Sequence, residues 1–352
     1  MKKYALVLLA TMLASPLLAQ PYVAAPAAED LQRVWHLGRV TGDLERIIHF
    51  YHDVLGLNLR GEREAAIPFY SVAAINEFVD APANAEFRAA FMPIPYASDE
   101  RNPQNQIYLE AFEYRNIERH QFIPPLSDIG VSSMRVFVMD IDAVLAKVKA
   151  AGETVLTNGG EPVNVAAPRG FSGTARAVML RDPDGYPVEL MQLTDGPALP
   201  AIRSNAQVVG MQMTLVVENL ERALDFYQRF AGSELNTQAA SDWQPTGFSE
   251  LRNLVPIEWR NASVQLPGST LQLELVELRG VSQQRYTPKF QDIGFGHIAF
   301  MVRDIEVLHK RMGEFGLKTL SASGTWTQIN PNLRAIYTRD PDGLFLELIE
   351  QR

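Results

Sequence analysis

The sequence predicts an α+β fold in which one βαβββ module is repeated four times, as two tandem domains. Two repeated phrases support this prediction. The segment D-P-D-G-Y-P-V-E-L at 182–190 returns as D-P-D-G-L-F-L-E-L at 340–348. The segment D-L-E-R-I-I-H-F-Y at 43–51 returns as N-L-E-R-A-L-D-F-Y at 219–227. Repeats of this kind indicate a duplicated unit, and 352 residues are enough for two domains.

Each module is expected to begin with a strand followed by a helix. Alternating apolar residues predict four opening strands, W-H-L-G-R-V, S-M-R-V-F-V, M-Q-M-T-L-V-V and H-I-A-F-M-V. An Asp or Asn followed by Leu or Ile comes after each strand, and then apolar residues recur at helical spacing. Helices are therefore predicted over 44–55, 141–151, 220–230 and 305–315.

About three further strands are expected to complete each module, and the last of them carries a glutamate. Asp-Pro-Asp-Gly is turn chemistry, because Pro presets φ and Gly tolerates the tight corner. The apolar strands after these turns contain Glu189 and Glu347, and the corresponding strands at 106–113 and 271–277 contain Glu110 and Glu274. A carboxylate in an apolar strand is costly to bury unless it is paired or binds a metal. The repetition therefore favours a duplicated functional site.

The ends of the repeats give the domain boundaries. Residues 1–19 have the form of a secretory signal peptide: a basic start at Met1-Lys2-Lys3, an apolar run shorter than a membrane span, and small residues before Gln20. A Pro/Ala-rich leader at 20–30 follows. The two domains are expected at 31–196 and 208–352, with a linker at 197–207. We therefore expect a periplasmic or secreted protein, and the absence of cysteine rules out disulfides and thiolate chemistry.

The charge and composition of the chain limit the classes of molecule that it is expected to bind. The net charge is −9 and no Lys/Arg-rich run occurs, whereas a nucleic-acid-binding protein would need a basic surface. We expect a small-molecule substrate, no nucleic acid, no membrane after signal cleavage, and a monomer or homodimer.

The motifs resemble those of the vicinal oxygen chelate superfamily, which includes glyoxalase I, extradiol dioxygenases, and fosfomycin and bleomycin resistance proteins. The segments that carry the resemblance are openings such as G-F-G-H-I-A-F-M-V-R-D-I and closings such as D-P-D-G-L-F-L-E-L. The resemblance covers nearly all of 31–352. It implies that two modules pair into a curved mixed sheet, and that each gives one metal ligand from its first strand and one from its last.

The resemblance also implies where these ligands lie in each module. The first-strand position falls seven residues before the Asp or Asn that starts the helix, and the last-strand position falls on the embedded glutamate. In chain order the first-strand positions hold His36, Ser133, Gln212 and His297, and the last-strand positions hold Glu110, Glu189, Glu274 and Glu347. Imidazole and carboxylate together suit one divalent ion such as Zn, Ni, Co, Mn or Fe.

Two ways of pairing the modules stay open. If each half closes on itself, the better site consists of Gln212, Glu274, His297 and Glu347, which resembles one class of glyoxalase I. If the first module pairs with the fourth, the site consists of His36, Glu110, His297 and Glu347, which resembles another class. His297 and Glu347 belong to the site under either pairing.

The resemblance implies a metal-dependent enzyme, most simply a glyoxalase-type lyase or isomerase acting on a small oxygenated substrate, and the signal peptide implies that this enzyme is exported. The metal would polarise a substrate oxygen, and Glu347 or its partner Glu110 or Glu274 would move a proton on the adjacent carbon. One alternative is an extradiol ring-cleaving dioxygenase, which uses two histidines and one carboxylate on iron. A further alternative is a small-molecule (antibiotic) binding protein without catalysis.

Overall fold

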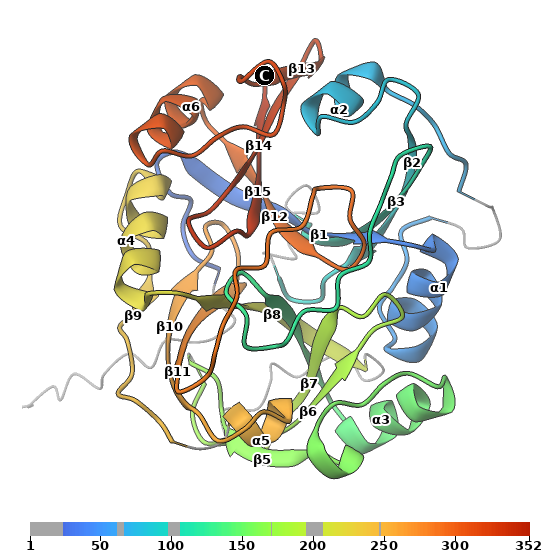
Figure 1. Ribbon diagram of the computed structural model, residues 1–352, viewed down its shortest axis with the longest axis vertical. Helices are drawn as coiled ribbons and strands as arrows, with labels where there is room; N and C mark the ends of the chain where they lie inside the picture. The colour runs from blue at the N-terminus through green and yellow to red at the C-terminus, as the bar shows by residue number, and fades with distance from the viewer. Residues whose placement is uncertain (1–23, 62–66, 98–105, 170, 195–206, 246–247) are drawn as a thin grey trace, which may run out of the picture.

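The computed structural model describes residues 24–61, 67–97, 106–169, 171–194, 207–245 and 248–352 (Figure 1). The predicted signal peptide, part of the leader and most of the predicted linker lie outside these ranges. Among the described residues no helix combines the length and apolar character needed to cross a membrane.

The chain forms four modules, as predicted. Module 1 contains β1 (Leu31–Thr41), α1 (Leu44–Ile48, extended by a π-helical turn at His49–Val54), α2 (Ala73–Phe78), β2 (Glu86–Pro93) and β3 (Tyr108–Arg115). Module 2 contains β4 (Ser132–Val138), α3 (Ile141–Ala150), a 3-10 turn (Asn158–Gly160), β5 (Val163–Ala166), β6 (Thr174–Arg181) and β7 (Pro187–Leu193). In module 1 an isolated bridge between Tyr70 and Phe87 stands where the other modules have an additional short strand.

Modules 3 and 4 repeat the same order. Module 3 contains β8 (Val208–Val217), α4 (Leu220–Ala231), β9 (Thr237–Gln238), α5 (Phe248–Arg252), β10 (Glu258–Gln265) and β11 (Gln272–Arg279). Module 4 contains β12 (Gly296–Val302), α6 (Ile305–Glu314), β13 (Thr327–Asn330), β14 (Leu333–Arg339) and β15 (Phe345–Gln351).

The first helix of every module begins at a side-chain cap. Asp43, Asp140, Asn219 and Asp304 each accept hydrogen bonds from backbone N–H groups of the first turn. Such caps satisfy donors that have no partner inside the helix. The repeated Asp or Asn in the sequence therefore marks the strand-to-helix junction, and each helix buries its apolar side against the sheets.

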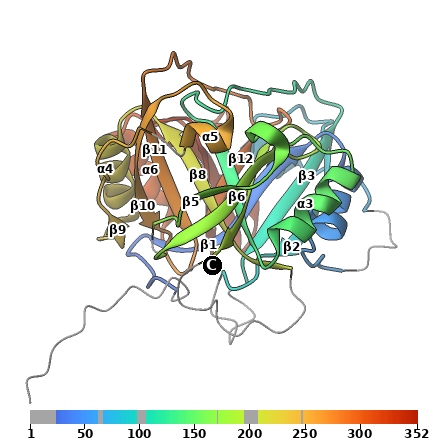
Figure 2. The same cartoon turned by 90° about the horizontal axis from the view of Figure 1, so that it is seen from below.

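The strands form two curved mixed sheets, which occupy the upper and lower halves of the molecule (Figure 1). The outer sheet has the order β13-β14-β15-β12-β1-β3-β2 and joins modules 1 and 4. The inner sheet has the order β5-β6-β7-β4-β8-β11-β10-β9 and joins modules 2 and 3. Most helices lie at the two sides, with the strands between them (Figures 1 and 2). The alternative in which each half of the chain closes on itself is therefore wrong.

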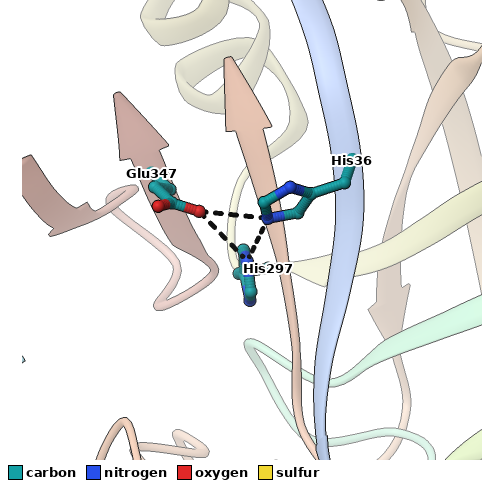
Figure 3. Close-up of side chains that lie close together, drawn as sticks. All are labelled: His36, His297 and Glu347. Atoms are coloured by element: carbon teal, nitrogen blue, oxygen red, sulfur yellow. Dashed lines mark hydrogen bonds and ion pairs between the residues drawn. The ribbon is translucent and has the colours of Figure 1, made fainter. Parts of the chain in front are cut away.

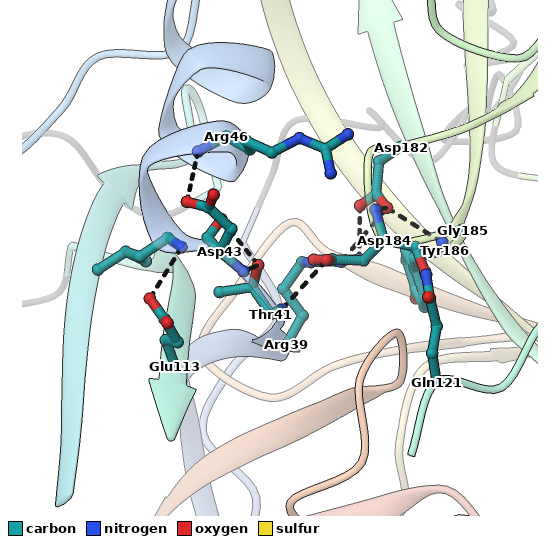
Figure 4. A network of polar contacts seen from close by, with 12 residues as sticks. Arg39, Thr41, Asp43, Arg46, Glu113, Gln121, Asp182, Asp184, Gly185 and Tyr186 are labelled. Carbon is teal, nitrogen blue, oxygen red and sulfur yellow. Dashed lines mark hydrogen bonds and ion pairs between the residues drawn. The ribbon is translucent and has the colours of Figure 1, made fainter. Parts of the chain in front are cut away.

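The Asp-Pro-Asp-Gly turn of module 2 fastens the inner sheet to module 1. Arg39 of β1 is fully buried and pairs with Asp182 at 2.6 Å and Asp184 at 2.8 Å (Figure 4). The Tyr51 hydroxyl donates to Asp182 at 3.0 Å. Gly185 completes the turn at φ +87°, a backbone conformation that favours glycine. The two sheets are thus locked together by a charged contact deep inside the protein.

Candidate metal centre

Four side chains from four neighbouring strands of the outer sheet meet at one place, and Figure 3 shows three of them, His36, His297 and Glu347. Nε2 of His36 lies 2.9 Å from Nε2 of His297 and 3.0 Å from a carboxylate oxygen of Glu347. The Glu110 carboxylate contacts the same nitrogen at 3.0 Å, and Nε2 of His297 lies 3.5 Å from Glu347. These four residues, called the outer site below, are the set expected if modules 1 and 4 pair.

Strand register brings the four side chains to one point. His36 pairs with Ala299, which also pairs with Glu347 on its other side. His297 pairs with Gly38, which also pairs with Glu110. Neighbouring strands lie about 4.8 Å apart, so ligands that face each other across one small residue are held within reach of a single ion.

Gly38 leaves the room that the His297 ring needs. A Cβ atom at position 38 would lie 1.9 Å from Cε1 and 2.2 Å from Nε2 of His297. Real side chains do not approach so closely, and the imidazole is fully buried, so it has little freedom to move away. Glycine at this position is therefore required by the ligand opposite it.

The charges in the outer site are strongly coupled. Burial lowers the pKa of His36, but the adjacent carboxylates of Glu110 and Glu347 outweigh burial and raise this pKa to about 10. Burial and the nearby His36 charge lower the pKa of His297. Burial raises the pKa of Glu347, yet its contacts with His297 and His36 bring it down to about 2. Before any metal binds, His36 therefore carries the proton that holds the two carboxylates together.

This donor set fits a divalent cation. Ligand atoms of His36, His297 and Glu347 all lie within 4.8 Å of one another, and Glu110 contacts His36 from the side. Two imidazole nitrogens at 2.9 Å hold at most one proton between them, so a shared cation relieves the repulsion of their lone pairs. With both histidines neutral, the two carboxylates give the site a charge of −2. Imidazole and carboxylate together favour a transition-metal ion, and binding would release the His36 proton.

Aromatic side chains surround the outer site. The rings of Phe112 and Phe290 lie 5.8 and 5.9 Å from the His297 ring, measured between centroids. Tyr337 lies on β14, next to the strand that carries Glu347, and its hydroxyl lies 3.3 Å from Nε2 of His297. The Glu110 side chain is the most accessible of the four, with 15% of its surface exposed. The outer site is thus largely enclosed by protein, with aromatic rings against His297.

Sequence reasoning did not identify Tyr337, although a signal for it was present. Tyr337 and Glu347 pair across β14 and β15, and they lie at equal distances in the chain from Asp342 in the turn. A tight turn fixes the register of the strands that it joins, so the sequence alone could have identified Tyr337 as the cross-strand neighbour of Glu347.

The other predicted ligands lie elsewhere. Gln212 and Glu274 belong to the inner sheet and do not join His297 and Glu347, because module 3 pairs with module 2. They lie on β8 and β11, in the same sheet as Ser133 on β4 and Glu189 on β7, and these four positions are called the inner site below. The place between these side chains holds a guanidinium group: Arg135 contacts Glu189 and Glu274, each at 2.7 Å. The proposal of Gln212 and Glu274 as ligands beside His297 is therefore wrong.

Arg135 also had a sequence signal that was missed. It lies two residues after Ser133, and side chains two apart in a strand share one face. An arginine on that face, among carboxylates from neighbouring strands, indicates an ion pair.

Two family models match the chain. Both describe the glyoxalase/bleomycin resistance protein/dioxygenase superfamily, one over residues 33–190 and the other over residues 211–336. Together they cover most of the chain, and each match spans two modules.

Solved structures with the same fold include glyoxalase I from Zea mays, at 21% identity and a TM-score of 0.55, covering 91% of this chain and 93% of that one. A point mutant of the same maize enzyme matches at 21% identity, a TM-score of 0.54, and 91% and 94% coverage. A putative dioxygenase from Bacillus subtilis matches at 14% identity and a TM-score of 0.49, with 92% and 86% coverage. A search of the curated proteins gives no significant match.

Proposed function

This chain belongs to the glyoxalase/bleomycin resistance protein/dioxygenase superfamily, and from that premise we propose that it is a metal-dependent enzyme with its metal centre at the outer site. His36, His297 and Glu347 would hold the ion, and Glu110 would complete the set. The observation that supports this proposal is the meeting of two imidazoles and a carboxylate, with all ligand atoms within 4.8 Å of one another.

The reaction that this arrangement supports best is a glyoxalase-type isomerisation or lyase reaction. A bound divalent ion would supply Lewis-acid polarisation of a carbonyl or enediolate oxygen. The two carboxylates have different surroundings: Glu347 contacts both histidines, whereas Glu110 contacts only His36 among them and is more exposed. Glu110 is thus better suited to carry a proton to and from the carbon next to that oxygen.

The surrounding side chains suit this role. Phe112 and Phe290 would shield the reacting carbon from water, which strengthens electrostatic interactions inside the site. Burial and the charges of Glu347 and Glu110 raise the pKa of Tyr337 well above its ordinary value, so its hydroxyl stays protonated. Tyr337 can therefore donate a hydrogen bond to a substrate oxygen that enters beside His297.

One observation favours a second candidate. The three residues that group most closely, His36, His297 and Glu347, form the two-histidine, one-carboxylate set used by non-heme iron oxygenases. A ring-cleaving dioxygenase is the function to test against the isomerase.

Metal analysis combined with two assays separates these candidates. We expect about one Zn, Ni, Co or Mn ion per chain, and exchange of a substrate C–H proton with solvent deuterium on the hemithioacetal of methylglyoxal with a small thiol. Glu110→Gln should abolish this exchange but leave the metal bound, whereas Glu118→Gln, an exposed control, should change neither. Bound iron together with oxygen uptake on catechols would support the dioxygenase instead. A metal-free protein would contradict both.

We also propose that the enzyme is exported after cleavage near Gln20. A positively charged start and a short apolar run support this proposal. Cell fractionation with N-terminal sequencing tests it: a mature protein found outside the cytoplasm and starting near Gln20 is expected, and an intact Met1 in the cytoplasm would contradict it.

A further inference from the structure

The inner sheet repeats the register of the outer sheet position by position. Arg135 pairs with Glu189 on one side and Gln212 on the other, as Gly38 pairs with Glu110 and His297. Thr214 pairs with Glu274 as Ala299 pairs with Glu347. Both sites therefore have a glutamate at each of the same two positions, and the position of Gly38 is taken by Arg135.

The Arg135 side chain lies where the metal ligands of a complete site would converge. Its guanidinium contacts Glu189 and Glu274 at 2.7 Å each and Oε1 of Gln212 at 3.3 Å. Arg135 is buried together with these three partners. Burial lowers its pKa, but the two carboxylates outweigh burial and raise it, so the group is a permanent cation.

A second guanidinium completes the charge balance. Arg252, at the end of α5, donates to the Ser133 hydroxyl at 3.2 Å and lies 3.6 Å from Glu189. Two arginines thus face the two carboxylates of the inner site, which is electrically neutral. The outer site has two carboxylates and neutral histidines, and a divalent ion would balance it. Two guanidinium groups therefore supply the charge that one divalent ion would supply.

We propose that the inner site is a latent metal site in which Arg135 and Arg252 stand in for the ion. Once both guanidinium groups are removed, Glu189, Gln212 and Glu274 offer two carboxylates and an amide oxygen. Oxygen ligands suit hard cations, so this site would take Mn²⁺, in contrast to the mixed nitrogen and oxygen ligands of the outer site. Two consequences follow: the natural chain holds metal only at the outer site, and arginine at position 135 enforces this limit.

The test is the metal content of Arg135→Gly/Arg252→Gln. Glycine reproduces position 38, and glutamine keeps a donor for Ser133 while it removes the charge. After dialysis against Mn²⁺ and desalting, we expect this variant to retain one more ion per chain than the natural sequence does. Arg135→Lys is the matched control, because it keeps a cation of similar length and should bind no additional metal.

Combination with His297→Ala assigns the additional ion to its site and separates this inference from the proposed function. The Arg135→Gly/Arg252→Gln/His297→Ala variant should still bind one Mn²⁺, whatever the outer site binds or catalyses. Because removal of two buried cations leaves two carboxylates facing each other, the variant should be destabilised without Mn²⁺ and its Tm should rise by several degrees with it. A folded variant that gains neither an ion nor Mn²⁺-dependent stability overturns the proposal, as does a second ion in the natural sequence that survives His297→Ala.

Discussion

The outer and inner sheets place glutamates at the same strand positions, yet they neutralise them differently. In the outer sheet Glu110 and Glu347 face two imidazoles, and in the inner sheet Glu189 and Glu274 face the Arg135 guanidinium. An imidazole releases its proton when a metal binds, whereas a guanidinium stays charged. The outer site is therefore suited to bind and release a metal ion, whereas the cation of the inner site is the Arg135 side chain itself. The following experiments test this difference, from the largest expected effect to the smallest.

Loss of an outer ligand should have the largest effect. His297→Ala removes one of the two imidazole ligands. Loss of a group that only orients a ligand can lower metal affinity by roughly 100-fold, and loss of a ligand itself should lower it further. Activity should fall with it. Gln212→Ala, at the matching position of the inner sheet, should leave metal content and activity unchanged. Isothermal titration and metal analysis of both variants measure the difference, and equal losses in the two would remove the distinction between the sites.

Loss of the inner cation should affect stability and leave metal binding unchanged. Arg135→Ala leaves Glu189 and Glu274 buried without their main partner. Removal of one member of a buried ion pair typically costs about 3–5 kcal/mol of unfolding free energy. Urea unfolding monitored by circular dichroism measures it. A loss below about 1 kcal/mol, or a parallel loss of the outer metal, would show that the guanidinium does not have the role assigned to it.

A single methyl group at Gly38 should disturb the outer site. In Gly38→Ala the new Cβ falls 1.9 Å from the His297 ring, so the imidazole must shift away from His36 and Glu347. We expect metal affinity to fall about 10–100-fold, as for loss of an orienting contact, and stability to fall by about 1–3 kcal/mol from overpacking. Gly313→Ala is the control, because nothing lies within 4 Å of its Cβ position. It should be neutral or slightly stabilising in α6, since alanine favours helices.

The two Asp-Pro-Asp-Gly turns also differ in how a buried carboxylate is neutralised, and we expect smaller effects there. Asp182 is paired with Arg39, whereas Asp340 accepts from the Tyr227 hydroxyl and from backbone N–H groups. Burial raises the pKa of Asp340 from 3.8 to about 6, and it raises that of Asp182 to about 6 as well, although the Arg39 charge opposes the shift there. The folded state thus binds this proton more tightly than the unfolded state does. The resulting stabilisation is present in full below pH 4 and is lost as the pH rises to about 6.

The natural protein should therefore lose stability as the pH rises from 4 to 6, and Asp340→Asn should not show this loss. One pKa unit corresponds to about 1.4 kcal/mol, and asparagine is a weaker acceptor than carboxylate, so we expect a net gain of about 1 kcal/mol at pH 8. Asp182→Asn should destabilise the protein at the same pH, because it weakens the pairing of the buried Arg39. Thermal unfolding of both variants at pH 4 and pH 8 measures these changes. A loss of stability in Asp340→Asn at pH 8 would contradict the assignment.

The sequence predicted the modules and the ligand positions but did not decide the pairing. Periodicity and caps are local, so the helix at 220–230 and the strand at 187–193 correspond to α4 and β7. Pairing depends on contacts between distant segments, and both alternatives buried the same apolar strands. Arg135, which fills the inner site, was missed for a related reason. Counting back from the helix cap led to Ser133, whereas the side chain that fills the site is Arg135, one step further along the same face.

The pairing of the first module with the last has a consequence for folding. His36 and His297 are separated by 261 positions, and β1 has β12 as one of its two neighbours in the outer sheet. Modules 2 and 3 adjoin in the chain and can form their sheet early, whereas one edge of β1 stays unpaired until β12 of module 4 reaches it. Assembly of the outer site therefore needs the longest-range pairing in this sheet, and a chain truncated before β12 would expose an unpaired edge of β1 and lack His297 and Glu347.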